Sequence, residues 1–329
     1  MAEMKENIRN YLRLGRAQTY PADWLLVLVP FLTGVQVPLI RVAAMSVFMF
    51  FIHIISFGEN SLLDFTQGYD KIDPSKAHHP LSTGAISVPD AMKFIHWGKA
   101  LLATVGCVMM FLWSPNPVMA MLCLFLWYAW GTAYNIGLSK VSLFGFLPIC
   151  LCFTAMGGFG WYLSHETLTP TGWWYLAYTF TVILFQISWS GHLKEMRQAE
   201  RSNLLIRMGA RLIDGFFEPG WAFLYGFAVK GASLYALAMI MGLVLSGPAA
   251  IWFVLMLLSV GAMTALLCMP RDYNRVAELK RMSLMEIISI YAPIPLMLPW
   301  SQALLLMATG VAYFYLMNRA LWGVSYPKV

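Results

Sequence analysis

The sequence has 329 residues, of which 59% are hydrophobic and only 12% are charged, and its mean hydropathy is +0.64. This composition excludes an ordinary soluble domain and is typical of a chain that crosses a membrane several times. The net charge of +6 does not indicate a nucleic-acid-binding protein, because the basic residues follow a membrane topology.

Apolar stretches long enough to span a bilayer, which needs about 20 residues per helix, recur along the whole chain. The last of them is overlong, and Pro293, Pro295 and Pro299 indicate that it begins as a kinked or interfacial piece. The sequence therefore predicts an all-α, polytopic membrane protein. Its roughly nine helices are expected at 22–42, 43–59, 95–113, 117–135, 142–163, 172–190, 219–245, 248–269 and 286–317.

The basic residues indicate how these helices are oriented. Most of the 22 Lys and Arg residues lie in segments that the predicted spans place on one side of the membrane, and the loops on the other side contain none. Because cytoplasmic loops are enriched in Lys and Arg, we expect the N-terminus and the polar loops 60–95 and 191–218 in the cytoplasm. In a prokaryote the membrane would be the plasma membrane.

An acidic cluster lies at the end of the second apolar run and consists of Asn60, Asp64, Asp70 and Asp73. Carboxylates are unfavourable at membrane depth, so such a cluster indicates a functional site. Asn60 and Asp64 share one helix face, and Asp70 and Asp73 follow on an expected loop. These oxygen ligands would suit Mg²⁺, which binds one or two carboxylates together with substrate phosphates. The alternatives are helix capping, loop solvation and, for Asp73 before Pro74, a turn.

Several segments, taken in chain order, resemble the UbiA superfamily of intramembrane prenyltransferases. Residues 11–16 are similar to its Arg-bearing segment before the first helix, and Asn60-x-x-x-Asp64 is similar to its first Asp-rich motif. The spacing from Asp64 to Asp70 resembles the variant of menaquinone-pathway members. Residues 73–87 resemble the stretch "RPL-x-SG-x-IS", with His79 where Arg is usual, and residues 134–140 resemble the Tyr…Lys segment after the fourth helix.

The resemblance implies one domain over 1–329, in which the helices enclose a central cavity. Residues 1–21 would form a cytoplasmic N-terminal segment, and the two polar loops would carry the active site. It further implies that Mg²⁺ is held by Asn60, Asp64, Asp70, Asp73, Glu195 and Glu200. Of these, Asp64, Asp70 and Glu195 would be catalytic. The implied diphosphate ligands are Arg16, Lys76, Tyr134, Lys140, Arg197 and Arg201.

The second Asp-rich motif departs from the family pattern. Aligned back from Gly209, its two Asp positions hold His192 and Met196, and a shift of three residues does not give a carboxylate pair. Glu195 and Glu200 are the carboxylates of this segment, and their separation of five positions is a poor match to a regular helix face. Both could instead pair with Lys194 or Arg201. His192 is open as a metal ligand, an acid–base group or neither.

The function implied by the resemblance is transfer of an isoprenyl group from its diphosphate to an aromatic or other lipid acceptor. The isoprenyl diphosphate would ionise to an allylic cation, which the hydrophobic acceptor captures. The degenerate second motif keeps a class I-type terpene cyclase on the same fold as the alternative. A non-catalytic lipid-binding or transport protein is a third reading, but the acidic cluster at one membrane face argues against it.

Overall fold

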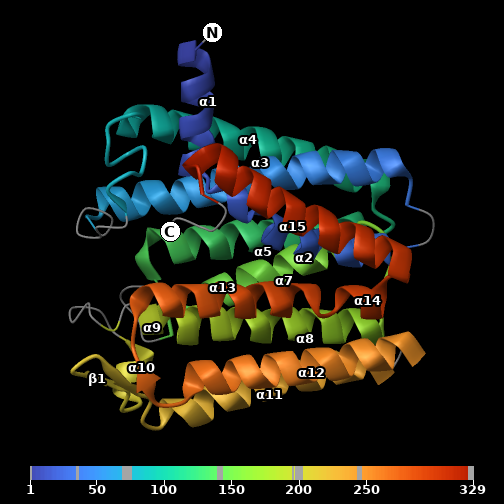
Figure 1. The fold of residues 1–329 in the computed structure, drawn as a ribbon. Coiled ribbons are helices and arrows are strands. Elements are labelled where there is room, and N and C mark those ends of the chain that lie inside the picture. Colours follow the sequence, from blue (N-terminus) through green and yellow to red (C-terminus); the bar gives the residue numbers. More distant parts are fainter. Residues whose placement is uncertain are drawn as a thin grey trace.

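The protein is described by a computed structural model that covers residues 2–34, 37–68, 76–138, 144–194, 196, 203–242 and 247–324. Within these residues the chain is mostly helical, and its long helices lie side by side in a bundle (Figure 1). The helices before the first polar loop are α1 (Ala2–Leu14), a short 3-10 helix (Ala17–Thr19), α2 (Tyr20–Leu32) and α3 (Leu39–Thr66). Between the two polar loops follow α4 (Val88–Trp113), α5 (Pro117–Ala133), α7 (Leu147–Tyr162) and α8 (Pro170–Phe185).

Two short π-helical segments, Tyr134–Leu138 and Gln186–Gly191, continue α5 and α8 on the side of the polar loops. The second half of the chain contains α9 (His192–Lys194), α10 (Leu204–Arg207), α11 (Ala222–Gly242), α12 (Gly247–Cys268), α13 (Arg275–Tyr291), α14 (Ile294–Met297) and α15 (Trp300–Trp322). Side-chain caps begin several of these helices. The Ser87 hydroxyl accepts from the Asp90 N–H of α4, and Asn274 Oδ1 accepts from Val276 N–H and Ala277 N–H of α13.

Six helices of the described residues are long and apolar enough to cross a bilayer, namely α3, α4, the α5 region, α11, α12 and α15, and α7 is a shorter apolar helix. Large apolar side chains such as Leu39, Phe111 and Leu305 are exposed on them, as expected for surface that faces lipid. Inside lipid a helix satisfies its backbone groups internally, which explains why the apolar runs fold this way. The predicted all-α, integral, multi-pass membrane architecture is confirmed.

The segment predicted as one last span over 286–317 is divided by its prolines. α13 ends at Tyr291, α14 follows Pro293, and α15 begins after Pro299. Arg9 and Arg13 of α1 donate to the carbonyl oxygen of Leu321 at 2.9 and 2.7 Å. The end of α15 therefore lies beside the N-terminal helix, so α15 runs back across the bundle. The prolines interrupt the segment as predicted, but the residues 286–317 belong to three helices and not to one kinked span. The count of about nine helices is not confirmed.

A small antiparallel sheet lies at the polar-loop side of α11 and α12 and was not predicted (Figure 1). β1 (Arg211–Ile213) pairs with β2 (Phe216–Glu218), and β2 pairs with β3 (Arg271–Asp272). Asp214 and Gly215 form the two-residue turn with φ of 49° and 83°, which is the geometry that Asp-Gly favours in a β-hairpin.

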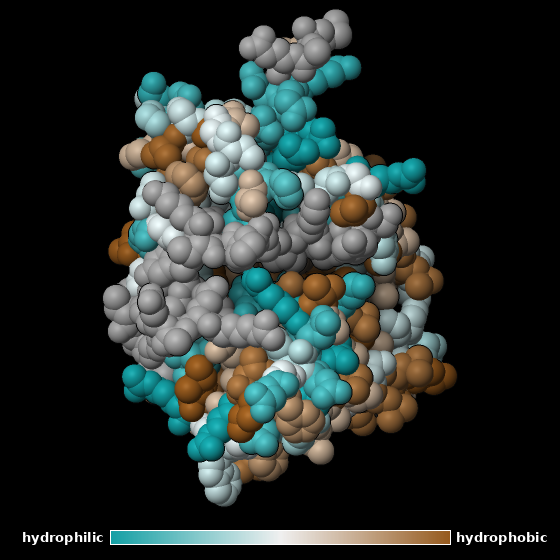
Figure 2. All heavy atoms as spheres, turned by 60° about the vertical axis from the view of Figure 1, so that its left-hand side comes forward, coloured by the Kyte–Doolittle hydropathy of each residue, from teal (hydrophilic) through white to brown (hydrophobic). Residues whose placement is uncertain are grey.

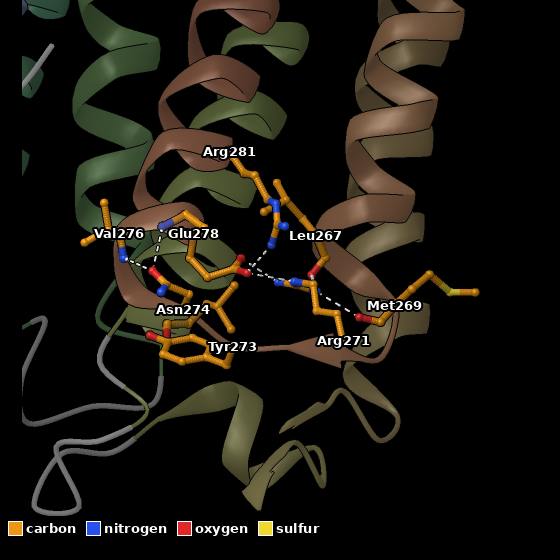
Figure 3. Close-up of polar contacts among 10 residues, drawn as sticks. Leu267, Met269, Arg271, Tyr273, Asn274, Val276, Glu278 and Arg281 are labelled. Atoms are coloured by element: carbon orange, nitrogen blue, oxygen red, sulfur yellow. Dashed lines mark hydrogen bonds and ion pairs between the residues drawn. The ribbon is translucent and has the colours of Figure 1, made fainter. Parts of the chain in front are cut away.

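The sheet is tied to α12 and α13 through a buried carboxylate (Figure 3). Glu278 is fully buried and accepts hydrogen bonds from Arg271 at 2.9 and 2.7 Å and from Arg281 at 2.6 Å. Arg271 also donates to the carbonyl oxygens of Leu267 and Met269 at the end of α12. This ion cluster fixes the start of α13, a helix that lines the cavity described below.

Candidate active site

The helices surround a cavity of about 400 Å³, which is in the size range of small-molecule sites. Apolar and aromatic side chains form much of its wall, among them Phe57, Trp127, Tyr128 and Phe153. Figure 2 shows hydrophilic residues near the middle of this view and hydrophobic residues along its right-hand flank. The cavity thus combines an apolar wall inside the bundle with polar groups contributed by the loop-side ends of its helices.

Five site residues predicted from the sequence line this one cavity: Arg16, Asn60, Asp64, Lys76 and Tyr134. Asn60 and Asp64 lie one turn apart near the end of α3, which stops at Thr66. Arg16 precedes α2 and Tyr134 begins the π-helical segment after α5. The fold therefore brings together residues from separate parts of the sequence, although their roles as ligands stay predictions.

The other predicted site residues lie outside the described residues. These are Asp70, Asp73, Lys140, Glu195, Arg197, Glu200 and Arg201.

A hydrogen-bonded chain that sequence reasoning missed lies behind Asn60. Lys99 of α4 forms an ion pair with Glu59 Oε1 and donates to Thr132 Oγ1 at 3.2 Å. Asn135 Nδ2 donates to Glu59 Oε2 at 3.0 Å, and Asn60 Nδ2 donates to Asn135 Oδ1 at 3.2 Å. Helices α3, α4 and α5 are joined by this chain at the cavity wall.

The chain also fixes which atom of Asn60 is available to a ligand. An ionised Glu59 only accepts hydrogen bonds, so Asn135 must direct its NH₂ group to Glu59 and its oxygen to Asn60. Asn60 must then give its own NH₂ group to Asn135, and its Oδ1 remains for the cavity. A side-chain oxygen is the atom that a hard cation requires.

Arg16 is held by a second buried pair. His53 is fully buried, and its Nδ1 lies 2.7 Å from Oδ2 of Asp23. Its Nε2 lies 3.1 Å from the carbonyl oxygen of Arg16 and 3.3 Å from Thr19 Oγ1. Arg16 itself has a left-handed backbone with φ of 50°, and its guanidinium carbon lies 5.7 Å from the centre of the Phe57 ring. The Asp23–His53 pair therefore positions the backbone turn that presents Arg16 to the cavity.

Lys194 and Arg275 line the cavity and add to its positive charge, and His192 lines it as well. His192 Nδ1 accepts from the Leu204 N–H at 3.3 Å, and the His192 carbonyl accepts from Asn203 at 2.7 Å. One ring nitrogen of His192 thus contributes to the fold of this loop. Met196, its partner in the alignment of the second motif, is buried in a separate apolar cluster.

Two other basic residues lie within the protein but do not line the cavity. Lys230 faces the bundle, because it is buried and its Nζ donates to Ser289 Oγ at 3.0 Å. His79, which takes the place of the usual Arg, is also buried. Burial, together with the positive charges of Lys76 and Arg16, lowers the pKa of His79 to about 3. The neighbouring His78 is exposed.

The side chains at this end of the cavity fit a Mg²⁺ ion that is completed by a ligand. Among the described residues, no group of three His, Cys, Asp or Glu side chains gathers that could hold a metal by itself. Asn60 Oδ1 and the Asp64 carboxylate supply hard oxygen atoms one turn apart, in the cavity that the cations Arg16 and Lys76 also line. Mg²⁺ commonly binds through one or two carboxylates while phosphates and water fill its other positions.

Comparison with known proteins gives a family and a fold. The sequence model of the UbiA prenyltransferase family matches residues 16–290. Comparison with curated protein sequences gives no match.

Several solved structures share the fold at low sequence identity. A structure described as digeranylgeranylglyceryl phosphate synthase is 15% identical with a TM-score of 0.63, and the match covers 89% of this chain and 99% of that one. A UbiA homologue from Archaeoglobus fulgidus bound to GPP and Mg²⁺ is 15% identical with a TM-score of 0.62 and coverages of 88% and 99%. The same homologue bound to DMAPP and Mg²⁺ is 14% identical with a TM-score of 0.63 and the same coverages.

Proposed function

Because the chain belongs to the UbiA prenyltransferase family, we propose that it is a Mg²⁺-dependent intramembrane prenyltransferase. It would move an isoprenyl group from its diphosphate to an aromatic or other lipid acceptor. The proposal rests on one observation. The same cavity is lined by Arg16, Asn60, Asp64, Lys76 and Tyr134. The homologue structures that contain GPP or DMAPP together with Mg²⁺ support the same donor class.

The donor diphosphate lies at the polar end of the cavity in this proposal. Asn60 and Asp64 would hold Mg²⁺ there, and the bound ion would supply positive charge to the departing diphosphate. Arg16 and Lys76 bind the diphosphate oxygens directly, with Tyr134 as a hydrogen-bond donor. Lys194 and Arg275 also line the cavity, and their positive charges add to the attraction of the diphosphate. By the positive-inside rule, this end faces the cytoplasm.

The isoprenyl chain extends from the diphosphate along the apolar wall. When the bond between C1 and the diphosphate oxygen breaks, its electron pair leaves with the diphosphate and an allylic cation remains. The aromatic faces of Phe57, Trp127 and Tyr128 stabilise a cation electrostatically. The apolar wall excludes water, which would otherwise capture the cation before the acceptor does.

The proposal is tested by incubating purified protein with Mg²⁺ and geranyl or geranylgeranyl diphosphate, first without an acceptor. We expect little pyrophosphate release until a membrane-lipid or quinone-precursor extract is added, and a prenylated product afterwards. A cyclic hydrocarbon or alcohol formed with stoichiometric pyrophosphate and no acceptor would replace the transferase with a terpene cyclase. Absence of both donor binding and turnover would overturn the proposal.

A further inference from the structure

Glu286 differs from the other acidic residues that the structure describes in the cavity wall. Asp23 is paired with His53, and Glu59 is bound by Lys99 and Asn135. Asp64 lies in the predicted metal site. No Lys, Arg or His nitrogen of the described residues lies within 4.0 Å of the Glu286 carboxylate. The side chain of Gln186, which also lines the cavity, interacts with Glu286, and the charges of Lys194 and Lys230 act on it from beyond that distance.

Glu286 lies deep in the bundle. The cavity-facing side of α13 presents Arg275, Leu279, Glu286 and Ile290. At 1.5 Å per residue, Glu286 is about 16 Å further along the helix than Arg275. Its two nearest neighbours on this side, Leu279 and Ile290, are apolar. A carboxylate without a paired cation is unfavourable at this depth, and such residues commonly mark a functional site.

The position of Glu286 is fixed by the residue one turn further along α13. The carbonyl oxygen of Ser289 accepts from the Tyr178 hydroxyl of α8 at 2.6 Å, and its hydroxyl oxygen accepts from Lys230 of α11 at 3.0 Å. The Lys230 ammonium also lies 4.6 Å from the centre of the Phe185 ring. Two neighbouring helices therefore hold α13 in a fixed rotation, with Glu286 and Gln186 directed to the same cavity.

We propose that Glu286 and Gln186 form the acceptor subsite and that it binds the O–H or N–H group of an uncharged acceptor. This inference rests on the proposed prenyl transfer. A carboxylate and a carboxamide oxygen both accept hydrogen bonds, so they recognise an alcohol, a phenol or an amine. An acceptor with a negative group next to its nucleophile would meet a like charge in a site of low dielectric constant.

Glu286 is then a catalytic residue that receives the proton of the acceptor. After the bond from C1 to the diphosphate has broken, the lone pair of the acceptor oxygen or nitrogen forms a bond to C1 of the allylic cation. The electron pair of the broken bond leaves with the diphosphate. The proton of the O–H or N–H group passes to the Glu286 carboxylate, so charge and atoms balance.

The test uses two probes that differ by one carboxylate, 1-naphthol and 1-hydroxy-2-naphthoate. Their affinity is measured for the detergent-purified full chain, with Mg²⁺-dependent binding of geranyl diphosphate measured in parallel. We expect the wild-type protein to bind 1-naphthol at least tenfold more tightly than 1-hydroxy-2-naphthoate. Glu286→Gln is expected to remove this preference and to leave geranyl diphosphate binding within about twofold. Gln186→Glu, which adds a second carboxylate, is expected to widen the preference.

Glu218→Gln is the matched control, because Glu218 is exposed in β2, and it should keep the wild-type ratio. Equal or tighter binding of 1-hydroxy-2-naphthoate by the wild-type protein, an unchanged ratio in Glu286→Gln, or no binding of either probe would overturn the acceptor subsite. Failure of the wild-type protein to bind geranyl diphosphate with Mg²⁺ would instead overturn the proposed function. The two failures are therefore distinguishable.

Discussion

Asn60 donates its side-chain N–H to Oδ1 of Asn135 at 3.2 Å, and this bond determines which atom of Asn60 faces the cavity. Asn135 cannot reverse its amide, because its own NH₂ group is bound to Glu59, which Lys99 holds in place. An ion pair between α3 and α4 thereby sets the orientation of a predicted metal ligand.

Replacing Asn60 by Asp should weaken metal-dependent donor binding, although it adds a negative charge. The new carboxylate oxygen would lie against Asn135 Oδ1, so two acceptors would face each other without a proton between them. We expect the Mg²⁺ concentration needed for half-maximal binding of geranyl diphosphate to rise about tenfold in Asn60→Asp. An equal or lower requirement for Mg²⁺ would contradict the assigned amide orientation.

The double variant Glu59→Gln/Asn60→Asp should recover most of this loss. The new carboxamide at position 59 can accept from Lys99 through its oxygen and donate through its nitrogen to a reversed Asn135. The NH₂ group of Asn135 then reaches the new carboxylate at position 60, and every group in the chain has a partner. The same binding assay checks this prediction, and a double variant no better than Asn60→Asp would refute the proposed rearrangement.

Glu278 should be among the residues most important for stability near the sheet. Because it is fully buried between Arg271 and Arg281, Glu278→Ala would leave buried positive charge without its partner. Loss of one partner of a buried pair costs about 3–5 kcal/mol. Unfolding in detergent measured by circular dichroism should show this loss, with the exposed Glu218→Ala as a control that changes stability by less than about 0.5 kcal/mol.

Stability should fall in mild acid because of His79. Its ring nitrogens have no hydrogen-bond partner among the described residues, and its pKa is lowered to about 3. The unfolded chain binds a proton at His79 near pH 6.5, whereas the folded protein does not until about pH 3, so folding stability decreases as the pH falls through this range. Thermal melting between about pH 7.5 and pH 5 should show a smaller decrease for His79→Leu than for the wild-type protein. Identical pH profiles would contradict this assignment.

The membrane helices and the Asn60–Asp64 part of the site could be predicted from the sequence, because they depend on local patterns. Apolar runs locate the long helices, and the four-residue spacing of Asn60 and Asp64 places both on one face. The prolines predicted an interruption in 286–317, but not its extent, since three prolines in an apolar run can mark either a kink within one span or separate helices. The contacts of Arg9 and Arg13 with Leu321 show that α15 is a separate helix that runs back to α1. They join the two ends of the chain, so no local pattern predicts them.

The buried pairs could not be predicted, because each joins residues on different helices. In the sequence, Lys99 cannot be told apart from the lysines of the expected polar loop. Its ion pair with Glu59 is visible only in the structure. Asp23 and His53 lie 30 residues apart, and nothing local relates them. Asp214-Gly215 is a usable hairpin signal, but residues 191–218 were predicted only as a polar loop. Glu286 carried the clearest unused signal, as a carboxylate inside an apolar segment.

In the proposed function, Mg²⁺-dependent binding of the donor depends most directly on Asp64 as a ligand of the ion. Equilibrium binding of geranyl diphosphate should be measured with and without Mg²⁺ for the wild-type protein, Asp64→Ala and, as a control, the exposed Asp272→Asn. We predict Mg²⁺-dependent binding by the wild-type and control proteins, and loss of the Mg²⁺ dependence in an Asp64→Ala protein that melts at the wild-type temperature. Undiminished Mg²⁺-dependent binding by Asp64→Ala would contradict the central claim.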